Sequence, residues 1–97
     1  MKRFILRRRA SADLMDISAF SEREWGRSQA NVYLRRIQQA IENLAETPDM
    51  GPACDEIKRD HRRFPVGSHV VFYRKTAHRI EIVRILHQSK DVVRHLK

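Results

Sequence analysis

Several side chains in the C-terminal half of the sequence have the chemistry needed to cleave a phosphodiester bond. Cleavage of RNA needs a base for the 2′-hydroxyl, an acid for the leaving oxygen and cations that bind the phosphate. The candidate set is Glu56, Arg62, Arg63, Tyr73, Arg84, His87 and Lys90. Arg62 and Arg63 could bind a phosphate in a bidentate manner, and His87 could supply the acid. The same residue types also serve as partner contacts, so we favour a structural or contact role for His87 and a solvated one for Glu56.

Other kinds of site have little support. The three glycines are scattered and form no phosphate-binding loop. The five histidines never occur at His-x-x-x-His spacing within a predicted helix, and a single cysteine, Cys54, completes no zinc set. We therefore expect no metal and no cofactor.

The charge of the sequence restricts its partners. Twenty Lys and Arg against twelve Asp and Glu give a formal net charge of +8. Such a surplus favours an anionic partner: nucleic acid, an acidic protein, or a site where the two meet. The run Arg7-Arg8-Arg9 could contact DNA or an acidic partner, or could simply be exposed at the end of a strand.

Length and hydropathy indicate one packed domain, residues 1–97, with 41% hydrophobic residues. No apolar run approaches the 18 or more residues of a membrane span, and the start has too few apolar residues for a signal peptide. The absence of such an apolar run also leads us to expect no membrane partner. Because one cysteine forms no internal disulfide, we expect the protein in the reducing cytoplasm.

The N-terminal half predicts a strand followed by a helical hairpin. A first strand is expected at about 2–8, and a first helix with Ser11 as cap, Asp13 in its first turn and Gly26 as its stop. The residues that follow helical spacing along one face are Ala10, Leu14, Ile17, Ser21 and Trp25. A second helix opens at Ser28 and carries the most regular stripe in the sequence: Ala30, Tyr33, Leu34, Ile37, Ile41 and Leu44.

The period of the hydrophobic pattern changes from helical to two in the C-terminal half. A loop at 47–52 is followed by a weak strand at 56–63, a turn at 64–68, and strands at 69–75 and 79–86.

Side-chain alternation predicts how the last two strands face. In the first of these strands, Val70 and Phe72 lie on one face and Val71 and Tyr73 on the other. In the second, one face carries Ile80, Ile82 and Leu86, and the other carries Glu81, Val83 and Ile85. Apolar residues on both faces indicate a central or doubly covered strand. A short final helix could follow, with Ser89 as its cap. The order is βααβββ, an α+β fold in which the hairpin packs on one face of a small, mostly antiparallel sheet.

Nearly the whole chain resembles toxins of the ParE/RelE superfamily, and the ParE branch in particular. The resemblance is carried by Arg63-Phe64-Pro65-Val66-Gly67-Ser68-His69-Val70-Val71-Phe72-Tyr73-Arg74 and Ile80-Glu81-Ile82-Val83-Arg84-Ile85-Leu86-His87. Ala12-Asp13-Leu14-Met15-Asp16-Ile17, Trp25-Gly26, Leu44-Ala45-Glu46-Thr47-Pro48 and Gly51 agree with it. These segments occur in the family's order and with consistent spacing.

The resemblance implies a RelE/ParE-like fold and a toxin of a type II toxin–antitoxin system. It implies a cognate, ParD-like antitoxin whose C-terminal segment folds along the toxin, and possibly a hetero-oligomer that binds operator DNA through the antitoxin. ParE toxins are associated with DNA gyrase inhibition, whereas RelE toxins cleave mRNA on the ribosome. Since both activities occur on one scaffold, the alternatives are a ribosome-dependent endoribonuclease and a non-toxic, antitoxin-binding remnant.

The gyrase hypothesis needs a binding surface rather than a catalytic centre. Its predicted target contacts are Arg62, Arg63, Arg84, His87, Lys90 and Arg94. The ribonuclease alternative would use His87, Arg62, Arg63, Tyr73 and Arg84. The predicted antitoxin contacts are Leu14, Ile17 and Leu34, at the edges of the helical hairpin.

Overall fold

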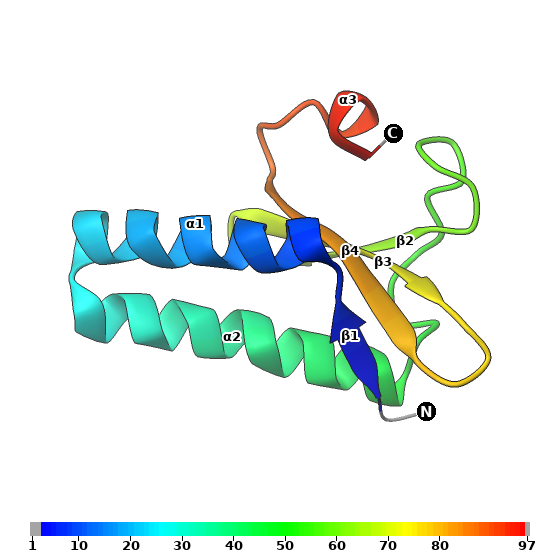
Figure 1. The fold of residues 1–97 in the computed structure, drawn as a ribbon, viewed down its shortest axis with the longest axis horizontal. Helices are drawn as coiled ribbons and strands as arrows, with labels where there is room; N and C mark the ends of the chain where they lie inside the picture. Colours follow the sequence, from blue (N-terminus) through cyan, green and yellow to red (C-terminus); the bar gives the residue numbers. More distant parts are fainter. Residues whose placement is uncertain (1–2, 97) are drawn as a thin grey trace.

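A computed structural model describes residues 3–96, which form a helical hairpin packed on a four-stranded sheet (Figure 1). The elements are β1 (Phe4–Leu6), α1 (Arg8–Trp25), α2 (Arg27–Glu46), β2 (Arg62–Val66), β3 (His69–Lys75), β4 (Ile80–His87) and α3 (Val92–Leu96). The strand order is β1-β4-β3-β2; β1 is parallel to β4 and the other pairs are antiparallel. The predicted α+β order and mostly antiparallel sheet are confirmed.

The hairpin begins earlier than its capping residues suggest. Arg7 donates its backbone N–H to Ile82 O at 3.0 Å, so sheet pairing continues up to the first residue of α1 and no loop intervenes. Ser11 lies inside the helix, where its N–H donates to Arg7 O, and its predicted role as cap is wrong. Gly26, with a φ of 84°, ends α1 as predicted, and α2 begins directly after it at Arg27 rather than at Ser28.

The main core lies between the hairpin and the sheet. The regular stripe of α2 supplies Ile37, Ile41 and Leu44, all nearly inaccessible to solvent. They pack with Ile17 of α1 and with buried strand residues, namely Val66, Val71, Tyr73, Ile80, Ile82 and Ile85. Trp25 is the last residue of α1 and is half exposed, because this end of the hairpin extends past the sheet (Figure 1). Within residues 3–96 no helix is long and apolar enough to cross a bilayer.

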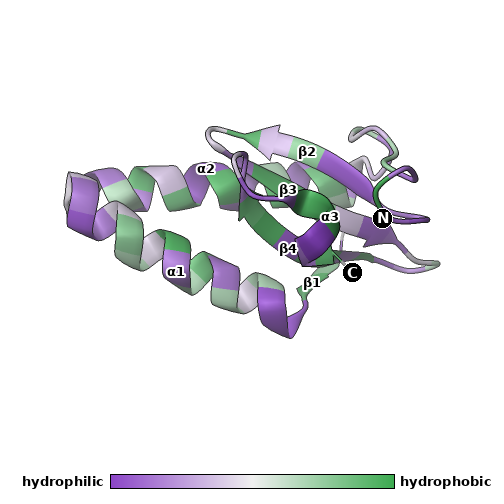
Figure 2. Ribbon diagram, turned by 90° about the horizontal axis from the view of Figure 1, so that it is seen from above, coloured by the Kyte–Doolittle hydropathy of each residue, from purple (hydrophilic) through white to green (hydrophobic). Residues whose placement is uncertain are grey.

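The opposite face of the sheet carries a second, smaller core. Phe72, Val83 and Leu86 are covered by Leu96 of α3 and by Cys54 from the segment that precedes β2. Figure 2 shows the strongly apolar β3 and β4 at the centre of the sheet, with α3 beside them. The last strand, predicted to be either central or covered on both sides, is therefore both.

A β-bulge changes the facing of β4 halfway along the strand. Tyr73 is paired with Ile82 but the preceding Phe72 with Arg84, so β4 contains one extra residue. Simple alternation consequently fails beyond this point. Ile85 joins the main core and Leu86 the second core, the reverse of the prediction.

Three other predicted boundaries are corrected. Most of the weak strand predicted at 56–63 is a set of turns, and β2 begins only at Arg62. The turn predicted at 64–68 shrinks to Gly67 and Ser68, because residues 64–66 pair with β3. Pro65 is tolerated there since β2 is an edge strand. At α3, the side chain of Asp91 rather than Ser89 accepts a backbone N–H, that of Arg94.

Candidate functional site

Arg84 is held by the helical hairpin and not presented to a partner. Its Nε and Nη2 donate to the two carboxylate oxygens of Asp13 at 2.8 and 2.9 Å, and Asp13 also accepts the backbone N–H of Ile85 at 2.9 Å. Both side chains are largely buried, at 14% and 12% exposure. The Asp13 hydrogen bond raises the pKa of Arg84 further. Asp13 lies beyond the first turn of α1, so its predicted role with the helix dipole is wrong; it ties α1 to β4.

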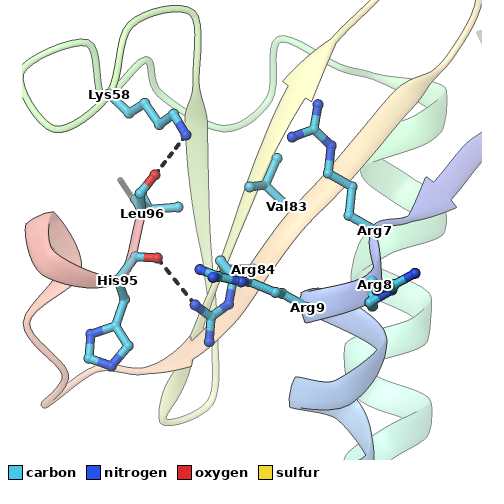
Figure 3. A pocket seen from close by; sticks show the side chains of 8 residues that line it. All are labelled: Arg7, Arg8, Arg9, Lys58, Val83, Arg84, His95 and Leu96. Atoms are coloured by element: carbon cyan, nitrogen blue, oxygen red, sulfur yellow. Dashed lines mark hydrogen bonds between the residues drawn. The ribbon is translucent and has the colours of Figure 1, made fainter.

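The same guanidinium also holds α3 on the sheet. Arg84 Nη1 donates to His95 O at 3.2 Å, and Lys58 Nζ donates to Leu96 O at 2.7 Å (Figure 3). Cations near the C-terminal end of a helix satisfy carbonyls that have no partner within it. Arg84 therefore links α1, β4 and α3.

Tyr73 and Arg62 organise the loop between α2 and β2. The buried Tyr73 Oη donates to Pro48 O at 2.7 Å and accepts the Gly51 N–H at 3.0 Å, and burial raises the pKa of this phenol. Arg62 Nη1 donates to Gly51 O at 2.7 Å, and its Nη2 lies 3.4 Å from Asp49. A Cβ at Gly51 would approach Tyr73 Oη to 2.7 Å, so only glycine fits this closely approached position.

His87 lies at the opposite end of β3 and β4. It pairs with His69, and the two rings meet edge to face with centroids 5.3 Å apart. His69 Nδ1 shares a 2.6 Å hydrogen bond with Tyr33 Oη of α2, and desolvation lowers the pKa of His69. The Nδ1 of His87 accepts the N–H of Ser89 at 3.1 Å, so the exposed ring is held in one orientation.

The structure does not gather the predicted ribonuclease set. Arg62 pairs with Tyr73 of β3, whereas His87 pairs with His69 of β3. Tyr73 and His69 are four residues apart, about 13 Å along the strand, so Arg62 and His87 lie at opposite ends of the sheet. Tyr73 and Arg84 are each engaged by internal partners. Within residues 3–96 no group of three or more metal-ligating side chains is found.

The remaining predicted target contacts are exposed. His87 ends β4, Lys90 lies in the connection to α3, and Arg94 lies on α3 itself. Arg63 is exposed on the edge strand β2 and pairs with Phe72 of β3. His87 is on β4, on the other side of β3, and pairs with His69, three residues before Phe72. His87 and Lys90 border the same groove at the C-terminal end of β4. Arg94 is exposed on α3, four residues after Lys90, whereas Arg63 lies on β2.

Two of the three predicted antitoxin contacts share a groove. Leu14 and Leu34 are partly buried and line an apolar groove of about 360 Å³ between the helices, which Leu6 of β1 and the exposed Met15 also line. Ile17, in contrast, is 6% exposed and belongs to the core. It borders a different groove, which also contains Trp25 and His87.

Sequence reasoning missed the partners that hold these side chains. Asp13 is separated from Arg84 by 71 positions, and Tyr33 from His69 by 36, so no local pattern indicates either pair. The one available signal is the position of Asp13 beside the apolar face of α1, because an aspartate is rarely buried there without a partner.

The sequence matches, over residues 4–92, the family model described as ParE toxin of type II toxin-antitoxin system, parDE. The chain belongs to the ParE toxin family. "Toxin ParE1" of Caulobacter vibrioides is 49% identical over 96 residues, which cover 99% of each chain. "Toxin ParE1" of Mycobacterium tuberculosis is 44% identical over 97% of each chain, and "Toxin ParE" of Escherichia coli is 30% identical over 99% of this chain and 94% of its own.

The ParE assignment agrees with the fold. A chain of the structure described as "Chromosomal ParDE TA system from P. aeruginosa" superimposes with a TM-score of 0.78, covering 90% of this chain and 96% of that one. At 20% identity this is a likeness of fold. The protein is thus a ParE toxin of a type II toxin–antitoxin system, with the βααβββ order read from its hydrophobic pattern.

Proposed function

We propose that this ParE toxin acts in the cytoplasm by binding DNA gyrase, without a chemical step of its own, and that a cognate antitoxin neutralises it. One observation carries the choice of a binding mechanism over RNA cleavage. Two members of the ribonuclease set, Tyr73 and Arg84, are committed to internal hydrogen bonds, and His87 lies at the other end of the strands from Arg62. General acid–base cleavage requires these groups within hydrogen-bond reach of one substrate.

The exposed target surface, defined as His87, Lys90 and Arg94, supports binding to an anionic or mixed partner. Its backbone is placed firmly, because Arg84 anchors both β4 and α3 close to it. A basic surface on a rigid support accelerates association with an acidic patch and sets its orientation. The steric consequence would be a gyrase–DNA complex trapped in its cleaved state.

We expect the double variant Lys90→Glu/Arg94→Glu to inhibit gyrase about tenfold less well than the wild type, since both charges face a complementary surface. Supercoiling and DNA-cleavage assays with purified gyrase measure this directly. Arg35→Glu/Arg36→Glu on the exposed side of α2 is the matched control, with the same change in net charge. Wild-type protein that leaves gyrase unaffected but cleaves mRNA on ribosomes would establish the endoribonuclease alternative, and inactivity in both assays the non-toxic remnant.

The apolar groove at Leu14 and Leu34 fits an antitoxin segment. It lies on the hairpin, away from the target surface, and beside the edge strand β1. An amphipathic segment that orders on binding would place its apolar side chains there, while acidic residues would match the net charge of +8. The similar fold found in a structure described as a ParDE TA system supports a partner of this kind.

Met15→Arg tests the antitoxin groove with little risk to folding, because Met15 lines it yet is 73% exposed. We expect about tenfold weaker binding of a peptide with the antitoxin's C-terminal sequence, measured by calorimetry, as for loss of a moderate interface contact. Val32→Arg introduces the same charge at a similarly exposed apolar position of α2 outside this groove. Equal affinities for Met15→Arg and Val32→Arg would place the antitoxin elsewhere.

A further inference from the structure

A basic groove lies on the face of the sheet opposite the hairpin, between the start of α1 and α3 (Figure 3). Its volume is about 480 Å³, and its floor is formed by Val83 of β4. Five arginine and lysine side chains line it, Arg7, Arg8, Arg9, Lys58 and Arg84, together with His95. No aspartate or glutamate lines it within residues 3–96.

The charge of this basic groove is only partly neutralised. Arg7 Nη2 lies 2.6 Å from Glu81, and Arg84 is paired with Asp13. Lys58 donates to a backbone carbonyl and forms no ion pair among residues 3–96. Arg8 and Arg9 are exposed and form no ion pair within the described part of the chain.

We propose that the basic groove binds the phosphodiester backbone of DNA, with Arg8 and Arg9 as its main contacts and Lys58 as a third. Arginine matches phosphate through its planar fork of donors and remains charged at any physiological pH. Two adjacent arginines on one helical turn, beside a lysine from another segment, provide several contacts along one strand of a duplex. Such contacts carry no sequence preference and depend strongly on salt.

The lining of the groove favours nucleic acid over an acidic, amphipathic peptide. Its apolar residues are Val83 and Leu96, which are only 7% and 2% exposed. They offer a peptide side chain little contact, and the remaining lining consists of His95 and of arginine and lysine side chains with charged ends. The groove at Leu14 and Leu34 offers that apolar surface, on the hairpin side of the sheet. The two grooves thus have different chemistry and lie on different faces.

This assignment rests on the proposed function only for the source of the DNA, which would be the segment held by gyrase. Contacts to enzyme and DNA together would strengthen binding to the gyrase–DNA complex relative to either component alone. The Arg7-Arg8-Arg9 run, whose role the sequence left open between DNA contact, acidic partner and simple exposure, would then be a phosphate-binding segment.

The test is binding of the purified chain to a fluorescently labelled 20-base-pair duplex, followed by polarisation over a range of salt concentrations. We expect Arg8→Glu/Arg9→Glu to weaken binding on the order of tenfold more than the charge-matched Arg35→Glu/Arg36→Glu, and to reduce the log–log salt slope by about 1.8, or about 0.9 per lost phosphate contact. Arg8→Gln/Arg9→Gln, a milder change with circular dichroism as a check of folding, should show the same slope change.

Equal loss of affinity in the α1 and α2 variants would overturn the proposal, since it would show that net charge alone drives binding. Absence of duplex binding by the wild type, or equally tight binding of an oligoglutamate peptide of matched charge through Arg8 and Arg9, would also overturn it. Duplex binding without gyrase inhibition would refute the proposed function and leave the groove assignment standing. Inhibition without duplex binding would do the reverse.

Discussion

Replacing Asp13 by alanine is expected to lower the free energy of unfolding by about 3 to 5 kcal/mol, the usual cost of removing one partner from a buried ion pair. The variant leaves the 14%-exposed guanidinium of Arg84 without its bidentate acceptor, and the N–H of Ile85 loses its partner as well. Because Arg84 also holds the C-terminal end of α3, we expect α3 to loosen with it.

Urea denaturation of the variant measures this loss. Asp16→Ala removes an exposed carboxylate from the same helix and should change stability by no more than about 0.5 kcal/mol. Combining Asp13→Leu with Arg84→Met replaces the pair by apolar groups and should recover much of the loss, since it leaves no buried charge. A cost below about 1 kcal/mol for Asp13→Ala, comparable with an exposed salt bridge, would contradict the role assigned to this pair.

Tyr73→Phe is expected to destabilise the protein by about 2 kcal/mol while leaving the folded protein able to inhibit gyrase. The hydroxyl is fully buried and bonds Pro48 O and Gly51 N–H, so its removal leaves both backbone groups without their partner. Denaturation gives the stability, and supercoiling assays at a temperature where the variant is folded give the activity. A catalytic role for Tyr73 in RNA cleavage predicts a different pattern, namely loss of mRNA cleavage on ribosomes by a fully folded variant.

Tyr33→Phe is the comparison for this variant. Its hydroxyl bonds His69 Nδ1, Val66 O and the Ser68 N–H, but it is only partly buried. Water can therefore replace the lost partners, and a smaller loss of stability is expected. Wild-type stability in Tyr73→Phe would contradict the internal role of this phenol. Loss of gyrase inhibition in the folded variant would return Tyr73 to the functional site.

The amino-acid sequence by itself determined the order and type of the elements. The apolar stripe of α2 follows from burial of one face of the helix, and the apolar residues of β3 follow from burial of both faces of the strand. Such periodic patterns are visible within a window of about ten residues. Gly26 also marked the hairpin correctly, because its positive φ disfavours other residues. The hydrophobic pattern also identified Lys90, Arg94 and Arg63 as surface residues, because none of them belongs to a periodic apolar face.

Only the tertiary structure decided which candidate side chains are free to act. Arg84 and Tyr73 have the residue types of a functional site, yet Asp13 and the loop at 48–51 engage them through contacts that join distant positions. The bulge in β4 and the early start of α1 likewise depend on pairing between β1, β3 and β4. Local propensity carries no information on these long-range hydrogen bonds, because the groups that satisfy each polar side chain are set by packing of the whole chain.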